Sequence, residues 1–318
     1  YINRYVSLIF EAVADAFGFT CYHDPNDPTD KATFIPGAYN TCEIYNNNEL
    51  LITGVCTSQE MESSPQKHPI RVGGYSRTGI LEYVMANPEK PIEYSEMTLR
   101  ELCNALMAPY GLQAFVDPTA ADIADQPLGT TATLEPNMTI KEFLAIIGLP
   151  RLVIFTHDNK GNLIIARANV NQEPIYNFGA TGQPVTRKRL RFGGDSMHSI
   201  IWAVGQAGAD ENSMYDSFIN PYVLSKKVRK TFPQTQNIFE KEYETGYRPG
   251  VFLQKWGTDV ITPLTARQYV GNQLKDIKLM IEIQGWTLNG KIVKPNNVVT
   301  VTDPELGIFK KSKWFIER

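Results

Sequence analysis

Short apolar-rich runs separated by polar turns dominate the first ninety residues of the chain. Residues 46–49 (Asn-Asn-Asn-Glu) predict a hairpin turn, because asparagine tolerates a positive φ. Residues 70–75 predict a strand that is partly broken by Gly73 and Gly74. The remaining runs that predict strands are 17–22, 41–45 and 50–55. The pattern therefore indicates a β-rich N-terminal region.

The apolar spacing changes to that of helices after residue 95. Thr98 is followed by Glu101, and Thr139 by Glu142, which is the spacing of a capping box at a helix start. Apolar residues then recur at intervals of three and four behind each box. Predicted strands follow the helices at 112–116, 152–155 and 162–167. These elements predict a small α/β unit over about 96–175.

Strands are predicted again from residue 184 onwards. They cover 187–192, 199–206, 277–286, 298–301 and 314–316, with a loop or short helix at 212–221. Asn289 and Gly290 form a strong hairpin signal. Thr262 and Pro263 fit the N-cap and first turn of a third helix. The expected fold class is α+β and β-rich, with several domains.

Composition narrows the class of protein. The chain has 318 residues, of which 31 are Lys or Arg and 34 are Asp or Glu, so its net charge is −3. That balance argues against a dedicated nucleic-acid binder. An apolar fraction of 42% with a charged fraction of 20% excludes wholesale disorder. At roughly 150 residues per domain, the length predicts two or three domains. No apolar run approaches the roughly 18 residues that a membrane span requires.

The four cysteines, Cys21, Cys42, Cys56 and Cys103, fit neither a disulfide scaffold nor a paired zinc motif. We interpret them as buried thiols in a reducing compartment. The chain begins at Tyr1 rather than methionine, so we expect a trimmed or partial N-terminus.

Motifs for catalysis and cofactor binding are not found in the sequence. Residues 74–79 (Gly-Tyr-Ser-Arg-Thr-Gly) have the wrong spacing for a nucleophile elbow, and we interpret them as a turn. Neither a P-loop nor a dinucleotide fingerprint is present. Cys21 and His23 would share a strand face, but a metal would need two further ligands. His157 is interpreted as a hydrogen-bonding turn residue. We therefore predict no catalytic, cofactor-binding or metal-binding residues.

Three charged segments are interpreted structurally. Glu240, Glu242 and Glu244 alternate along a predicted edge strand. The basic runs at 187–191 and 226–230 lack the interleaved aromatic residues of a nucleic-acid surface, so they predict charged strand faces or subunit contacts.

Several motifs occur in an order that resembles one known family. Residues 72–83 contain the motif G-x-S-R-T at the end of a predicted strand. Residues 97–115 follow with a predicted helix that begins T-L-x-x-[IL] and ends in Pro-Tyr-Gly. Residues 284–299 and 303–308 contain Gln-Gly-Trp, Lys-Pro-Asn-Asn and Asp-Pro-Glu-Leu-Gly, and 247–249 contains part of an R-Y-R-P string. This combination resembles the baseplate hub proteins of contractile-tailed phages, especially Mu-like phages, and of related injection devices.

The resemblance implies a homotrimeric ring that adapts the six-fold tail tube to the three-fold spike, with DNA passing through its channel without specific binding. It implies a first β-barrel at 1–95 that lacks its opening strand. The α/β unit at 96–175 follows, then a second barrel from 176–235 and 276–318, with a helix-bearing insert at 236–275. Trp286, Trp314 and Tyr247 are candidate interface anchors, although a core role is favoured for each.

The implied partners are further copies of the chain, a trimeric spike protein, tail tube or tube-initiator proteins, and baseplate wedge proteins. The implied location is the virion tail baseplate, after assembly in the host cytoplasm. The resemblance implies no enzyme activity. Two alternatives stay open: a tail-associated cell-wall hydrolase, and a receptor- or carbohydrate-binding tail module.

Overall fold

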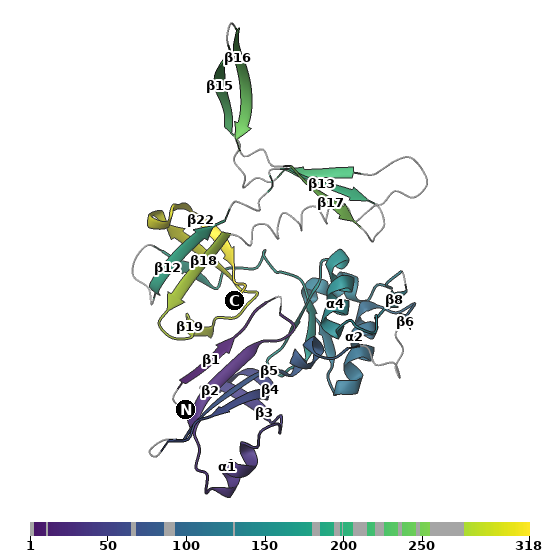
Figure 1. Ribbon diagram of the computed structural model, residues 1–318, viewed down its shortest axis with the longest axis vertical. Coiled ribbons are helices and arrows are strands. Elements are labelled where there is room, and N and C mark those ends of the chain that lie inside the picture. The colour runs from purple at the N-terminus through teal and green to yellow at the C-terminus, as the bar shows by residue number, and fades with distance from the viewer. Residues whose placement is uncertain are drawn as a thin grey trace. The chain divides into compact units, whose positions relative to one another are not determined.

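The computed structural model describes most of the chain, which divides into two units, and Figure 1 labels its strands and helices. The described residues are 3–10, 12–64, 68–85, 93–129, 131–179, 185–193, 198, 200–205, 215–219, 226–234, 237–245, 249–254 and 277–318. The first unit comprises Tyr1–Ala180, Trp286–Pro304 and Ile308–Arg318, and the second comprises Thr181–Gly285 and Glu305–Gly307.

A five-stranded antiparallel sheet forms the N-terminal part of the first unit. Its strand order is β1 (Asn3–Ser7), β2 (Ala16–Tyr22), β5 (Pro69–Ser76), β4 (Glu49–Met61) and β3 (Thr41–Asn46). The short helix α1 (Pro28–Thr33) lies between β2 and β3 in the chain. The hairpin predicted at 46–49 is confirmed, because β3 and β4 pair from Asn46 and Glu49 outward.

The strand predicted at 70–75 is confirmed as β5, which continues through Gly73 and Gly74. The predicted partial break is limited to an irregularity in its pairing with β4, where the register shifts between Cys56 and Ser58 opposite these glycines. Phe17 is fully buried on β2, and its ring fills the space above Gly74 on the adjacent strand β5 and above Gly54 on β4, the next strand in the sheet. A Cβ atom at either glycine would overlap both this ring and a backbone carbonyl oxygen. The glycines therefore allow close packing of an aromatic side chain rather than ending the strand.

The α/β region of the first unit places two helices beside a three-stranded sheet. The helices are α2 (Leu99–Met107) and α4 (Ile140–Gly148), with the single turn α3 (Ala121–Ala124) between them. The sheet order is β7 (Ala114–Val116), β10 (Leu163–Ala166) and β9 (Ile154–His157), and a separate pair joins β6 (Glu93–Tyr94) to β8 (Ala132–Thr133). Leu102, Leu144 and Leu163 are fully buried in one apolar cluster, so this region has its own core.

Both predicted capping boxes are confirmed. The Glu101 N–H donates to Thr98 Oγ1 at 3.2 Å, and the Thr98 N–H donates to Glu101 Oε2 at 2.9 Å. Thr139 and Glu142 form the same reciprocal pair at 3.2 and 2.8 Å. These bonds hold the pKa of each glutamate below its usual value, because the backbone N–H stabilises the carboxylate.

We expect Thr98→Ala and Thr139→Ala each to lower the free energy of unfolding by about 1 kcal/mol, because a backbone donor at the helix start loses its partner. Urea unfolding followed by circular dichroism measures the change. Thr131→Ala is the control, since Thr131 is exposed and caps no helix, and we expect a change within about 0.5 kcal/mol. Equal effects of all three substitutions would contradict the prediction.

The C-terminal strands complete the first unit. Strand β11 (Tyr176–Phe178) pairs in parallel with β21 (Val298–Asp303), which pairs in turn with β22 (Ile308–Phe315). The predicted Asn289-Gly290 hairpin is confirmed between β19 (Thr287–Leu288) and β20 (Lys291–Ile292).

These C-terminal strands contact the N-terminal segment of the same unit. The Phe10 N–H donates to the Glu317 carbonyl oxygen at 2.8 Å, and Lys294 Nζ lies 2.7 Å from Glu49 Oε1. The rings of Phe10 and Phe315 pack edge to face at 5.0 Å. Segments from the two ends of the sequence are thereby held together.

The second unit contains strands in its described part. Strand β12 (Val185–Phe192) pairs with β18 (Ile277–Ile283), and β15 (Lys226–Gln234) pairs with β16 (Asn237–Thr245). A third sheet has the order β14 (Tyr215–Ile219), β13 (Ile200–Gly205) and β17 (Pro249–Gln254). The loop or short helix predicted at 212–221 is wrong, because β14 forms there against the apolar strand β13. The helix predicted at Thr262 lies outside the described residues.

These sheets and helices confirm the β-rich α+β class. The closure of two tube-like barrels stays a prediction. In the described part of the chain, no helix is long and apolar enough to span a membrane.

Candidate functional site

A buried polar cluster connects the N-terminal sheet to the β9–β10 hairpin. The Asp15 carboxylate accepts a hydrogen bond from the Ile9 N–H at 2.8 Å. Its other oxygen, Oδ2, lies 2.9 Å from Nε2 of His157, and the two side chains are 5% and 3% exposed. An ion pair so deeply buried contributes to stability only while both partners are present.

The surroundings of His157 favour its charged form. Burial alone would lower the pKa of this histidine, but the Asp15 carboxylate and the Asp158 carbonyl outweigh burial and raise the pKa above its usual value. Nδ1 lies 2.8 Å from the Asp158 carbonyl oxygen, so both ring nitrogens face acceptors. The interpretation of His157 as a hydrogen-bonding turn residue missed its ion pair, because Asp15 lies far away in the sequence.

The turn that follows His157 rests against the N-terminal sheet. Asn159 Nδ2 donates to the Leu50 carbonyl oxygen at 3.1 Å, and Thr53 Oγ1 donates to the Asn159 carbonyl oxygen at 2.9 Å. Gly161 has a φ of +82°, and a Cβ there would lie 2.8 Å from the side chain of Arg77. Together with the ion pair, these contacts fix the hairpin to the sheet.

Ser76, the serine of the Gly-Tyr-Ser-Arg-Thr-Gly segment, has its hydroxyl group fully engaged. Its Oγ accepts from the Asp15 N–H at 3.1 Å and lies 3.0 Å from Thr78 Oγ1. Because Thr78 Oγ1 donates to the Val13 carbonyl oxygen, the Ser76 proton points to Thr78. Ser76 and Thr78 are 2% and 0% exposed, so no substrate reaches them. The short 3₁₀ helix Arg77–Glu82 follows, in agreement with the predicted turn.

The cysteines are unpaired thiols in the structure. Cys103 is buried, as predicted, whereas Cys21, Cys42 and Cys56 are only partly buried. A hydrogen bond between Cys42 and Cys56 raises the pKa of the first thiol and lowers that of the second. Within the described residues, no group of three or more His, Cys, Asp or Glu side chains could hold a metal ion, and Cys21 and His23 belong to no such group.

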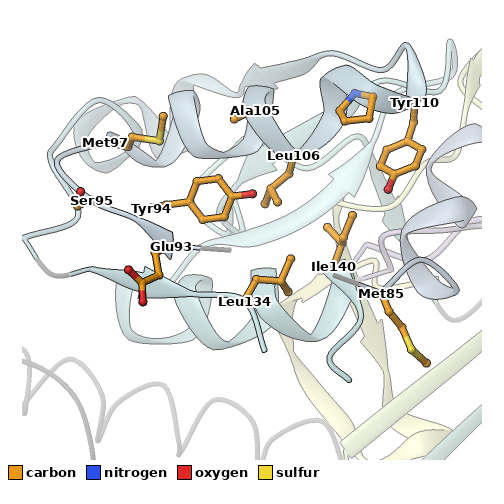
Figure 2. A pocket seen from close by; sticks show the side chains of 11 residues that line it. Met85, Glu93, Tyr94, Ser95, Met97, Ala105, Leu106, Tyr110, Leu134 and Ile140 are labelled. Carbon is orange, nitrogen blue, oxygen red and sulfur yellow. The ribbon is translucent and has the colours of Figure 1, made fainter. Parts of the chain in front are cut away.

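A pocket of about 370 Å³ opens in the α/β region between α2 and the start of α4 (Figure 2). Its floor consists of four side chains that are at most 9% exposed: Tyr94, Leu106, Leu134 and Ile140. Figure 2 shows these side chains converging from β6, α2, the segment after β8 and α4. The pKa of Tyr94 is raised, first by burial and then by the neighbouring Tyr110. Leu106 and Ile140 belong to the apolar spacing behind the two capping boxes, and that pattern did not reveal the pocket.

The basic run of β12 lies on one exposed strand face. Arg187, Arg189 and Arg191 alternate along the strand and are all exposed. Arg187 forms a weak ion pair with Glu282 at 3.7 Å. The structure thus agrees with a charged strand face.

The other basic run pairs with the acidic run. Strand β15 aligns with β16 so that Lys227 lies opposite Glu244 and Arg229 opposite Glu242. The two charged segments that the sequence singled out are therefore paired strands of one hairpin.

The proposed aromatic anchors have different environments. Trp286 is 40% exposed, whereas Trp314 is partly buried and donates from Nε1 to Ser312 Oγ at 2.8 Å. Tyr247 lies outside the described residues.

No protein-family model matches this sequence, and no curated protein matches it either. Solved structures do match. The tail protein from Neisseria meningitidis MC58 superposes with a TM-score of 0.74 at 17% identity, covering 99% of this chain and 85% of that one. The 43 kDa tail protein of prophage MuSo2 from Shewanella oneidensis gives 0.72 at 18% identity, over 98% of this chain and 87% of its own. The chain has a phage tail protein fold. The predicted resemblance is therefore confirmed at the level of fold.

A third tail protein fits less closely. Prophage tail protein gp18 from Listeria monocytogenes EGD-e has a TM-score of 0.57 at 11% identity, over 99% of this chain and 82% of its own. The similarity to this phage tail fold extends over both units of the chain, not over the α/β region alone.

Proposed function

We propose that this chain is a structural subunit of a phage tail baseplate hub, a homotrimeric ring between the six-fold tail tube and the three-fold spike. The observation that carries the proposal is the likeness of nearly the whole chain to two phage tail proteins. The order of the hub-like sequence segments supports the same assignment. The subunit would act in the virion tail after assembly in the host cytoplasm.

The proposal assigns each part of the chain to a position in the ring or outside it. Residues 1–95 would form one barrel-like ring domain, and 176–235 with 276–318 would form the other. The α/β region at 96–175 and the insert at 236–275 would lie outside the ring. The subunit would then contribute two similar domains to a ring of pseudo-six-fold symmetry.

Exposed apolar side chains on strands support an assembly role. Tyr5 on β1 is 58% exposed, Phe192 on β12 is 63% exposed and Phe309 on β22 is 76% exposed. In the described sheet, β1 and β3 stand at the two ends of the strand order. Sheet edges and exposed aromatics are the surfaces through which subunits associate.

The ring would let DNA pass without binding it, which suits a lumen that is not strongly basic. Arg187, Arg189 and Arg191 would therefore face outward or a neighbouring subunit. A trimer structure with these arginines lining the channel would contradict this part of the proposal.

We expect the purified chain to form a trimer of three times 35.8 kDa. Light scattering across a concentration series measures the mass, and electron microscopy of the trimer peak shows whether it is a ring. A chain that stays monomeric throughout the series, with and without a trimeric spike protein, would contradict the hub proposal.

A turbidity assay on peptidoglycan distinguishes the hydrolase alternative. We expect no clearing, because the one serine of a nucleophile-like segment is buried and engaged. Clearing would overturn the purely structural role.

A further inference from the structure

We propose that the pocket between α2 and α4 binds a protein segment that carries an apolar side chain next to lysine or arginine. In the hub assignment that segment belongs to a neighbouring tail protein. The inference goes beyond the hub proposal and does not depend on the oligomeric state, because a single chain holds the whole pocket.

The shape of the pocket suits an apolar anchor. Its volume of about 370 Å³ is near the lower end of the about 300–1,000 Å³ typical of binding pockets. The floor is apolar apart from the Tyr94 hydroxyl, so an inserted aliphatic or aromatic side chain would lose contact with water. Methionines stand at its rim, with Met85 54% exposed and Met97 partly buried. Thioether side chains adapt their shape to an incoming group.

Negative charge around the rim of the pocket favours a segment in which a lysine or arginine stands next to the apolar side chain. Glu93 lines the pocket, and Glu96 and Glu135 each directly follow a lining residue in the chain. All three are exposed, and none forms an ion pair with another described residue. The nearby Lys141 is already paired with Glu82 at 2.5 Å. An approaching lysine or arginine would therefore meet exposed carboxylates that form no ion pair within the described part of the chain.

A protein segment fits the pocket better than a small molecule does. Small-molecule sites hold a few polar groups at fixed positions inside the cavity to orient their ligand. Here the polar groups of Glu93 and Ser95 are exposed at the rim, and apart from the hydroxyl groups of Tyr94 and Tyr110 the remaining lining is apolar. An apolar centre with methionine and tyrosine, surrounded by a polar rim, is the arrangement of a protein interface.

The test is selection of a random peptide library, displayed on yeast, against the immobilised full chain. We expect enrichment of peptides with a leucine- or phenylalanine-type anchor beside lysine or arginine. Synthetic copies of the enriched peptides are then titrated against variants by fluorescence anisotropy. Ala105→Trp places a large side chain at the pocket wall, and we expect it to weaken binding at least about tenfold, which is ~1.4 kcal/mol.

Ala145→Trp is the matched control, because Ala145 is an exposed alanine in α4 that does not line the pocket. Thermal unfolding shows whether either tryptophan variant is folded. Glu93→Lys changes an exposed rim residue, and we expect it to weaken binding about two- to fivefold. No enriched motif, or equal affinity of the Ala105→Trp and Ala145→Trp variants, would overturn the site. Unchanged affinity of the Glu93→Lys variant would overturn the charge preference.

Discussion

Replacing His157 with alanine is expected to lower the free energy of unfolding by about 3–5 kcal/mol. The substitution leaves the Asp15 carboxylate buried without its cationic partner, which lies 2.9 Å away in the folded chain. It also removes an imidazole that links the β9–β10 hairpin to the N-terminal sheet. Urea unfolding of the purified chain, followed by circular dichroism, measures the loss.

The control for this variant is His68→Ala. His68 is only partly buried, and its ring lies near an exposed serine, Ser63, at 3.5 Å. We expect its removal to change stability by no more than about 0.5 kcal/mol. The double variant Asp15→Ala with His157→Ala should lose less than the sum of the two single losses, because the partners share one interaction. Simple additivity would show that the ion pair is not the cause.

The same pair makes stability depend on pH. The pKa of His157 is raised in the folded chain above its unfolded value of about 6.5. Its contribution is therefore complete below about pH 6.5 and is lost as the pH rises through the folded pKa. We expect the parent chain to lose more stability than the His157→Ala variant between pH 6 and pH 9. Parallel profiles of the two proteins would refute a charged His157.

The substitution Phe17→Ala is expected to have the second large effect, lowering the free energy of unfolding by about 3–5 kcal/mol. The ring is fully buried, and Gly54 and Gly74 leave no side chain that could fill the space after its removal. The cavity would lie in the middle of the N-terminal sheet, against Ile44 and Ile52. Urea unfolding again measures the change.

Phe115→Ala provides the matched control for Phe17. Phe115 also lies on a strand, β7, but is 47% exposed. We expect a loss well below half that of Phe17→Ala, because most of the ring surface is already in contact with water. Comparable losses would mean that Phe17 is not tightly enclosed by the two glycines.

Local features were predictable from the sequence, whereas long-range pairings were not. Thr98 and Thr139 stand three residues before their glutamates, so the bonds that cap both helices depend only on nearby positions. Asp15 and His157 show no such spacing, and nothing at either position indicates that the fold buries them together. The strand at 215–219 was missed for the same reason, because its partner β13 decides its conformation.

Glycines and the pocket illustrate a second limit of sequence interpretation. Gly73 and Gly74 indicate a weak point in a strand when they are considered alone. The role of Gly74 becomes clear only once the Phe17 ring is known to lie on it, and that of Gly73 once Ser58 is known to lie beside it. Leu106 and Ile140 likewise have the apolar spacing of core residues. Whether such residues fill the space between them depends on side-chain packing, which an apolar pattern does not specify.

The parallel pairing of β11 with β21 determines the order in which the chain can fold during synthesis. Tyr176 aligns with Val299, and all of Thr181–Gly285 is made between them. At about 5–20 residues per second, a ribosome takes roughly 6–25 s to span that interval. Throughout this time β11 lacks β21, the strand with which it pairs in the complete chain. The first unit therefore begins to fold first but is completed last. A chaperone that binds nascent chains has the most time to bind this unit.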